Sequence, residues 1–115
     1  MDAGKARGGL VIHGKTPTKA EREWMASVAR LGCIVCRLQG RSYVPCAVHH
    51  ILDGGRRKGH METIGLCDPG HHQGAPKSSG QVSRHPNKAQ FEARYGTEEF
   101  LLAVTRHAIA EILPK

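Results

Sequence analysis

The chain has 115 residues, and 17 Lys and Arg against 10 Asp and Glu give it a formal net charge of +7 with its eight histidines neutral. This length fits one small domain with a limited apolar core, and the charge favours a polyanionic partner such as nucleic acid. No stretch approaches the ~18 apolar residues of a membrane span, and Met1 to Val11 lacks the apolar run of a signal peptide. We therefore expect an intracellular, cytoplasmic protein with no membrane contact.

The N-terminal region divides at about residue 18. Residues 1–17 are rich in Gly, Lys and Ala without periodicity, which predicts a flexible basic arm. The run from Thr18 to Glu21 is a capping box, and the apolar residues that follow at helical spacing predict a helix that ends at Gly32. We therefore treat residues 18–115 as the folded domain.

The middle of the chain predicts a tight turn and then a β-hairpin. Cys33 to Cys36 form a CxxC knuckle, and residues 47–52 are β-prone with His49 and His50 near their end. Residues 53–60 form a turn-rich basic loop, and residues 63–66 suit a return strand. This pattern predicts a hairpin with a basic tip.

The C-terminal part predicts helices. The Asp68-Pro69 pair suits a short helix starting near His71, and residues 74–84 look like a flexible insertion. Residues 87–95 and a segment capped by Thr97 predict two closing helices. The predicted apolar face of the last helix comprises Phe100, Leu101, Val104, Ala108 and Ile112. Together the elements predict a small α+β fold.

Four residues have the spacing of a structural zinc site. A CxxC knuckle supplies two ligands, and a distant pair four residues apart completes the tetrahedron if it lies on a helical turn. In a reducing compartment such cysteines are more often zinc thiolates than disulfides. We predict zinc at Cys33, Cys36, Cys67 and His71, with Cys46 either replacing His71 or remaining a buried free cysteine.

A second ion is predicted beside the first. His72 lies about 100° around a helix from His71, so it should point elsewhere and join the pair His49-His50. Two imidazoles on a divalent ion, beside a third that deprotonates water, suit phosphodiester hydrolysis. Neighbours on a regular strand face opposite sides, so His49 and His50 converge only if the strand bends or ends there. Arg56, Arg57 and Lys58 would offer positive charge to the phosphates.

The order of these motifs resembles the HNH endonucleases, whose ββα-metal core binds one catalytic divalent cation. The chain is more closely similar to the phage Ref family of RecA-dependent nucleases, over about residues 24–104. The motifs that carry this likeness are Gly54-Gly55-Arg56-Arg57, Gly59-His60, Thr63-Ile64-Gly65-Leu66-Cys67, His71-His72, and Phe91 through Tyr95-Gly96-Thr97-Glu98.

The resemblance implies roles for individual residues. His49 takes the place of the first ligand of a catalytic Mg²⁺ or Mn²⁺, His72 that of the second, and His50 that of the general base. The Asn that gives the HNH motif its middle letter has no visible counterpart in this sequence, and His60, Glu62 or Thr63 would stand near its place. It further implies DNA as substrate and a RecA filament as partner in phage recombination, in the cytoplasm of a bacterial host.

Other roles stay open. Asp53 would orient a histidine or contact the ion. The second pair of predicted zinc ligands, Cys67 and His71, is one residue further apart than in the usual CxxC or CxxH. His71 and His72 could therefore exchange roles. His85 is either an extra ligand or a polar residue before Pro86. The arm is shorter and richer in Gly than the lysine-rich tail associated with Ref.

Two other function classes compete with a nuclease. A non-catalytic zinc-stabilised DNA-binding or adaptor module would keep the cysteines but would have no need of His50. A zinc-dependent nucleobase deaminase needs a Glu in an HxE motif, and the run from His49 to Ile51 lacks it.

Overall fold

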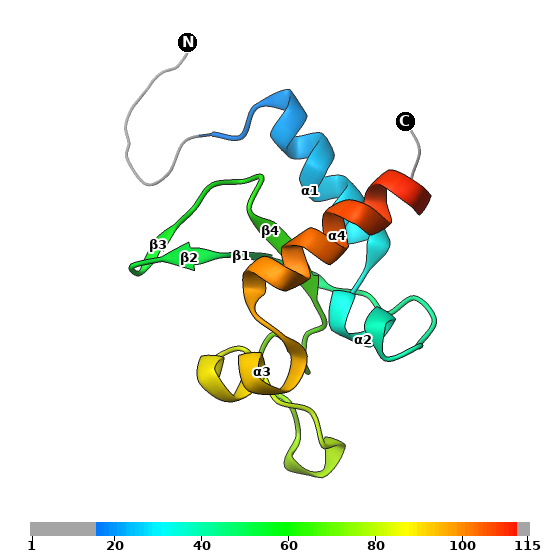
Figure 1. The fold of residues 1–115 in the computed structure, drawn as a ribbon, viewed down its shortest axis with the longest axis vertical. Coiled ribbons are helices and arrows are strands. Elements are labelled where there is room, and N and C mark those ends of the chain that lie inside the picture. The colour runs from blue at the N-terminus through cyan, green and yellow to red at the C-terminus, as the bar shows by residue number, and fades with distance from the viewer. Residues whose placement is uncertain (1–15, 113–115) are drawn as a thin grey trace.

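The computed structural model describes residues 16–112 and has an α+β architecture (Figure 1). The elements in chain order are α1 (Lys19–Leu31), α2 (Ile34–Leu38), β1 (Ala47–His50), β2 (Leu52–Asp53), β3 (Arg56–Arg57), β4 (Thr63–Leu66), a 3₁₀ helix η1 (Lys77–Ser79), α3 (Lys88–Tyr95) and α4 (Glu98–Ile112). The predicted fold class is confirmed. The predicted arm lies outside the described residues, apart from Thr16 and Pro17.

Helix α1 begins at the predicted capping box. The backbone N–H of Glu21 donates to Thr18 Oγ1 at 3.1 Å, and the N–H of Thr18 donates to Glu21 Oε1 at 2.8 Å. The helix ends at Gly32, whose φ of 85° favours glycine. A Cβ at Gly32 would also lie 2.6 Å from the carbonyl oxygen of Val44, so the chain passes closely there.

Strands β1 and β4 pair antiparallel, with His49 opposite Ile64 and His50 opposite Thr63. Beyond them, β2 and β3 pair at the tip of the hairpin (Figure 1). Because side chains alternate along a strand, His49 and His50 point to opposite faces. His49 is buried at 3% exposure, whereas His50 is partly exposed. The two imidazoles therefore do not converge on one ion.

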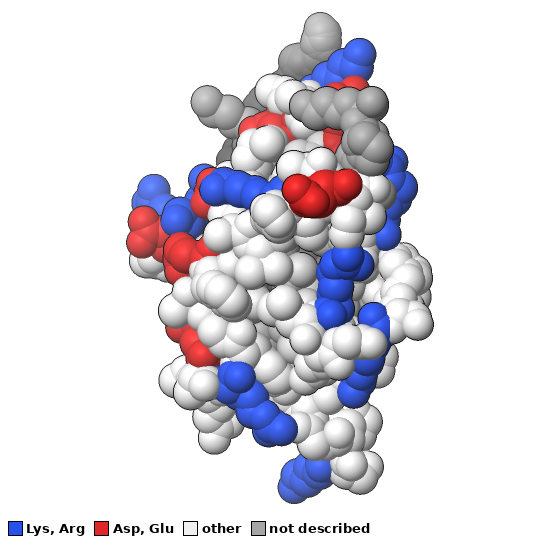
Figure 2. Space-filling view, turned by 45° about the vertical axis from the view of Figure 1, so that its right-hand side comes forward, with Lys and Arg blue, Asp and Glu red and all other residues white. Residues whose placement is uncertain are grey.

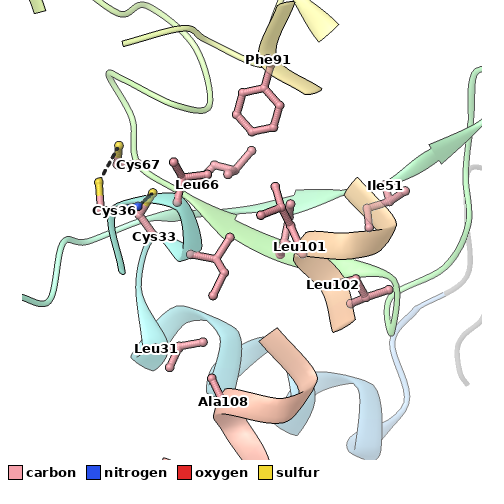
Figure 3. Packing of buried hydrophobic residues seen from close by; sticks show 13 residues of the cluster. Leu31, Cys33, Cys36, Ile51, Leu66, Cys67, Phe91, Leu101, Leu102 and Ala108 are labelled. Carbon is pink, nitrogen blue, oxygen red and sulfur yellow. Dashed lines mark hydrogen bonds between the residues drawn. The ribbon is translucent and has the colours of Figure 1, made fainter. Parts of the chain in front are cut away.

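Helices α1 and α4 contact β4 and each other, and α2 contacts both α4 and β4. Between them lies an apolar core to which α3 contributes Phe91 (Figure 3). On α4 the buried residues include Leu101, Leu102, Thr105 and Ala108. The prediction for this face was wrong at Phe100 and Ile112, which are 51% and 46% exposed. Among the described residues, none of the helices has the length and apolar character that crossing a membrane requires.

The helix predicted near His71 is absent from residues 67–87, where η1 is the one helical element. Gly70 and Gly74 instead form a bridge, and Gln73 bridges to His85. The Ser83 hydroxyl fastens this loop by donating to the carbonyl of Gly70 at 2.6 Å and accepting from the N–H of Ala75 at 3.0 Å. Residues 83–85 are thereby held against the segment that follows Cys67.

Candidate metal centres

Three buried cysteines, Cys33, Cys36 and Cys67, meet between α2 and the segment after β4 (Figure 3), and the buried His71 joins them. The Nδ1 atom of His71 lies 3.5 Å from the Sγ atoms of Cys33 and Cys36, and 3.3 Å from that of Cys67. The Sγ atoms of Cys36 and Cys67 lie 3.8 Å apart. The structure thus brings together all four residues of the predicted zinc set.

These separations match the edges of a zinc tetrahedron. With Zn–S of about 2.3 Å and Zn–N of about 2.05 Å, a tetrahedral ion separates two sulfurs by about 3.8 Å and a sulfur from a nitrogen by about 3.6 Å. The observed values are 3.8 Å and 3.3–3.5 Å. The cluster could therefore hold zinc with little rearrangement.

Backbone hydrogen bonds orient two of the four candidate ligand atoms, the Sγ atoms of Cys33 and Cys67. Cys33 caps α2, so that its Sγ accepts from the N–H of Cys36 at 3.4 Å. In the second half of the site, the N–H of His71 donates to Cys67 Sγ at 3.3 Å. Such bonds favour thiolates, the form that binds metal. Cys46 lies outside this cluster, with its Sγ 3.8 Å from the carbonyl of Val28.

Burial alone opposes ionisation of these groups. It raises the pKa of the Cys33 and Cys36 thiols, and it raises the pKa of Cys46 to about 11. Burial, followed by the nearby Arg41 and Arg94, lowers the pKa of His71 to about 4, which keeps its imidazole neutral and able to ligate. A cation at the centre would supply the charge that stabilises the thiolates.

A second cluster comprises His49, His72 and His85, whose candidate ligand atoms lie within 4.8 Å of one another. The ring centroids are separated by 5.4 Å (His49–His72), 5.2 Å (His49–His85) and 5.0 Å (His72–His85). His85 reaches this position because its N–H donates to the carbonyl of His72 at 2.9 Å. The set includes both predicted ligands, His49 and His72, together with His85, which the sequence left open as an extra ligand.

Two imidazoles of this cluster lie against carboxylates. His49 Nε2 lies 2.7 Å from Glu98 Oε2, and His72 Nδ1 lies 3.3 Å from Asp68 Oδ2. Glu98 also accepts from Arg84 Nε at 2.6 Å. Burial raises the pKa of Glu98, but the bonds from His49 and Arg84 outweigh it and hold that pKa below its usual value. A ring nitrogen bonded to a carboxylate is the usual outer environment of a metal-ligating histidine.

On the other face of β1, His50 pairs with His60. His50 Nε2 lies 3.1 Å from His60 Nδ1. Of the three residues considered for the place of the Asn, His60 is the one whose side chain contacts that of His50. Thr63 stands opposite His50 in the sheet, but its hydroxyl accepts from Trp24, and Glu62 pairs with Arg106. Burial lowers the pKa of His50, and Arg57 and His60 lower it further.

A hollow of about 410 Å³ adjoins this pair. His50, His60 and Arg57 line one part of it, and Thr18 and Glu21 at the start of α1 line another. The hollow is large enough for several waters or a phosphate group. Its lining combines an imidazole pair with a guanidinium, which suits an anionic ligand.

The charged residues at the tip of the hairpin differ in their exposure and in their ion-pair partners. Arg56 and Arg57 are exposed on β3, whereas Lys58 pairs with Glu62 at 3.8 Å and Glu99 at 3.7 Å. Asp53 is exposed and stands opposite Arg56, outside both histidine groups. On the face drawn in Figure 2, Lys and Arg side chains form separate groups around a broad uncharged area.

A buried cysteine-rich cluster and a histidine cluster beside one β-hairpin define a small α+β domain whose residues could hold metal ions. The sequence matches the family described as "Recombination enhancement, RecA-dependent nuclease" over residues 17–110, and the chain belongs to that family. This confirms the likeness to Ref nucleases drawn from the motifs. No curated protein matches the sequence closely enough to add to this assignment.

Proposed function

We propose that this protein is a metal-dependent DNA endonuclease of the HNH type that hydrolyses phosphodiester bonds. The observation that carries this proposal is the meeting of His49, His72 and His85 in one cluster. Three neutral nitrogen ligands leave coordination positions for water and substrate, as in catalytic sites. Membership of a nuclease family supports the reaction class.

The three histidines would hold a Mg²⁺ or Mn²⁺ ion, while the cluster of Cys33, Cys36, Cys67 and His71 would hold a structural zinc. When bound, the divalent ion would supply Lewis-acid stabilisation of the charge that develops on the phosphate and the leaving oxygen. The protein's part is to fix the imidazoles: His49 lies against Glu98, and His72 lies against Asp68.

His50 is the proposed general base. It accepts the proton of the attacking water, and the contact between His50 Nε2 and His60 Nδ1 fixes the orientation of its ring. The adjoining hollow would admit the attacking water, and Arg57 at its edge would offer charge to the DNA backbone.

The expected substrate contacts are to the DNA backbone. Arg56, Arg57 and Lys58 would bind phosphates and so favour no particular sequence. A RecA filament on the DNA is the proposed partner, in keeping with the family to which the chain belongs. Phage recombination is the setting in which we place this activity.

The test is cleavage of supercoiled plasmid and of single-stranded DNA in Mg²⁺ or Mn²⁺, with and without RecA and ATP. We expect the wild type to cleave, and His50→Ala to cut at least ~100-fold more slowly, since general bases contribute about 10²–10⁴-fold. His107→Ala, at an exposed position of α4, is the matched control.

The competing adaptor function gives a different result. Such a module would bind DNA without cleaving it under any of these conditions, and His50→Ala would bind as the wild type does. Cleavage that required RecA would support the proposed partner, whereas equal cleavage without it would remove RecA from the mechanism.

A further inference from the structure

Glu98 is a buried carboxylate whose contact with His49 does more than hold the ring in place. It is the first residue of α4 and is 1% exposed. A buried carboxylate requires strong partners, because an unpaired charge is expensive to remove from water. Glu98 has two on the same oxygen: Oε2 accepts from Arg84 Nε at 2.6 Å and lies 2.7 Å from His49 Nε2.

This contact determines which nitrogen of His49 can bind an ion. A carboxylate paired with a guanidinium is ionised and can only accept, so His49 Nε2 must carry a hydrogen and donate it. The lone pair of the neutral ring then resides on Nδ1. Of the two tautomers, Glu98 selects the one in which Nδ1 is the ligand atom.

Arg84 also ties Glu98 to the other histidines. The N–H of Arg84 donates to the carbonyl of His71 at 2.8 Å, and the next residue, His85, donates to the carbonyl of His72 at 2.9 Å. The Arg84–Glu98 pair therefore joins the start of α4 to the loop that carries His72 and His85. This connection holds His72 and His85 at their distance from His49, in addition to orienting the His49 ring.

We propose that Glu98 is a positioning residue that holds His49 in the Nε2–H tautomer and so presents its Nδ1 atom to the divalent ion. The inference rests on the proposed function, because it takes His49 as a ligand of that ion. Asp68 is the weaker counterpart, since its carboxylate is 33% exposed and lies 3.3 Å from His72. Removing an outer partner of this kind lowers metal affinity about 10–100-fold.

The first test titrates Mn²⁺ into the zinc-loaded protein by calorimetry. We expect Glu98→Gln to raise the Kd for Mn²⁺ about 10–100-fold. The matched control is Glu99→Gln, an exposed neighbour on the same helix, and we expect it to bind as the wild type does. Glu98→Asp, which keeps the charge, should recover part of the affinity. Wild-type Mn²⁺ affinity in Glu98→Gln would overturn the inference.

The same titration separates this inference from the proposed function. If His85→Ala weakens Mn²⁺ binding and Glu98→Gln does not, the ion site stands and the role of Glu98 fails. If neither His72→Ala nor His85→Ala changes Mn²⁺ binding, the ion site itself is wrong and both fail.

A second measurement needs no variant, which matters because Glu98→Gln leaves Arg84 with a neutral buried partner and can unfold the domain. Nitrogen NMR of the wild type, loaded with zinc but free of Mn²⁺, reports the tautomer of each histidine. We expect the proton of His49 on Nε2. A proton on Nδ1 would overturn the proposal whatever the variants do.

Discussion

The two candidate metal clusters adjoin in sequence at His71 and His72, yet they differ in ligand type, number and access to solvent. Cys33, Cys36, Cys67 and His71 supply four ligands, all buried. The histidine cluster supplies three, of which His72 and His85 are partly exposed. A closed set of four suits a structural ion, and an open set of three suits a catalytic one. Under the proposed function, the side chain of His71 would stabilise the fold while that of the next residue, His72, would take part in the reaction.

The largest effect should come from opening the closed cluster. Cys36→Ser removes one ligand from the proposed structural zinc site, and structural zinc contributes about 10–16 kcal/mol to the folding of zinc-finger peptides. We expect the variant to lose its zinc and to be unfolded at 25 °C, as measured by metal analysis and circular dichroism.

Cys46→Ser is the matched control for this prediction. Cys46 lies outside the cluster, so we expect it to keep one zinc per chain and to lose about 1 kcal/mol or less of unfolding free energy. A folded, zinc-free Cys36→Ser protein would show that the closed cluster is not structural.

Changes in the open cluster should affect activity without affecting folding. His72→Ala and His85→Ala each remove one of three ligands, and we expect DNA cleavage to fall at least ~100-fold, because the ion supplies several kcal/mol of transition-state stabilisation. Zinc content and melting temperature should stay near those of the wild type. Loss of zinc in His72→Ala would mean that His71 and His72 exchange roles.

Chelation should distinguish the two clusters in the wild type. Brief treatment with EDTA should abolish cleavage by stripping the weakly held Mg²⁺ or Mn²⁺, while the zinc and the melting temperature persist. Adding Mn²⁺ back should restore activity, since the ligands of the open cluster remain in place. Simultaneous loss of activity and of the folded state would contradict the division into a closed and an open cluster.

The closed cluster was predictable from the sequence and the open one only in part. The CxxC knuckle is local, and Cys67 and His71 follow at a spacing that a short turn can close. His85 stands 13 positions after His72 and reaches it through backbone bonds that the Ser83 hydroxyl fastens. Neither the backbone bond from His85 to His72 nor the Ser83 hydroxyl bond follows from a periodic pattern in the sequence. The helix predicted at His71 was wrong because Gly70 and Gly74 favour the bridged turn.

The direction of the His50 side chain could be predicted from a general rule, whereas its partner could not. Alternation along β1 already placed His49 and His50 on opposite faces, and the structure follows it. The partner of His50 required the fold, because His60 reaches it from the loop between β3 and β4. The carboxylate of Glu98 comes from a helix 49 positions away, and a distant contact of this kind cannot be derived from spacing.

The smallest effects should come from the basic tip, where single phosphate contacts contribute additively. Arg57 is exposed and lines the hollow beside His50, so Arg57→Gln should weaken DNA binding and reduce the slope of log K against log salt by about 1. Lys58 is already paired with Glu62 and Glu99, so Lys58→Gln should change that slope less.

Fluorescence anisotropy at several salt concentrations measures both slopes, with Arg30→Gln in the last turn of α1 as the control. A larger change for Lys58→Gln than for Arg57→Gln would show that the acidic partners release Lys58 to DNA. Equal slopes in all three variants and the wild type would place the DNA away from the tip.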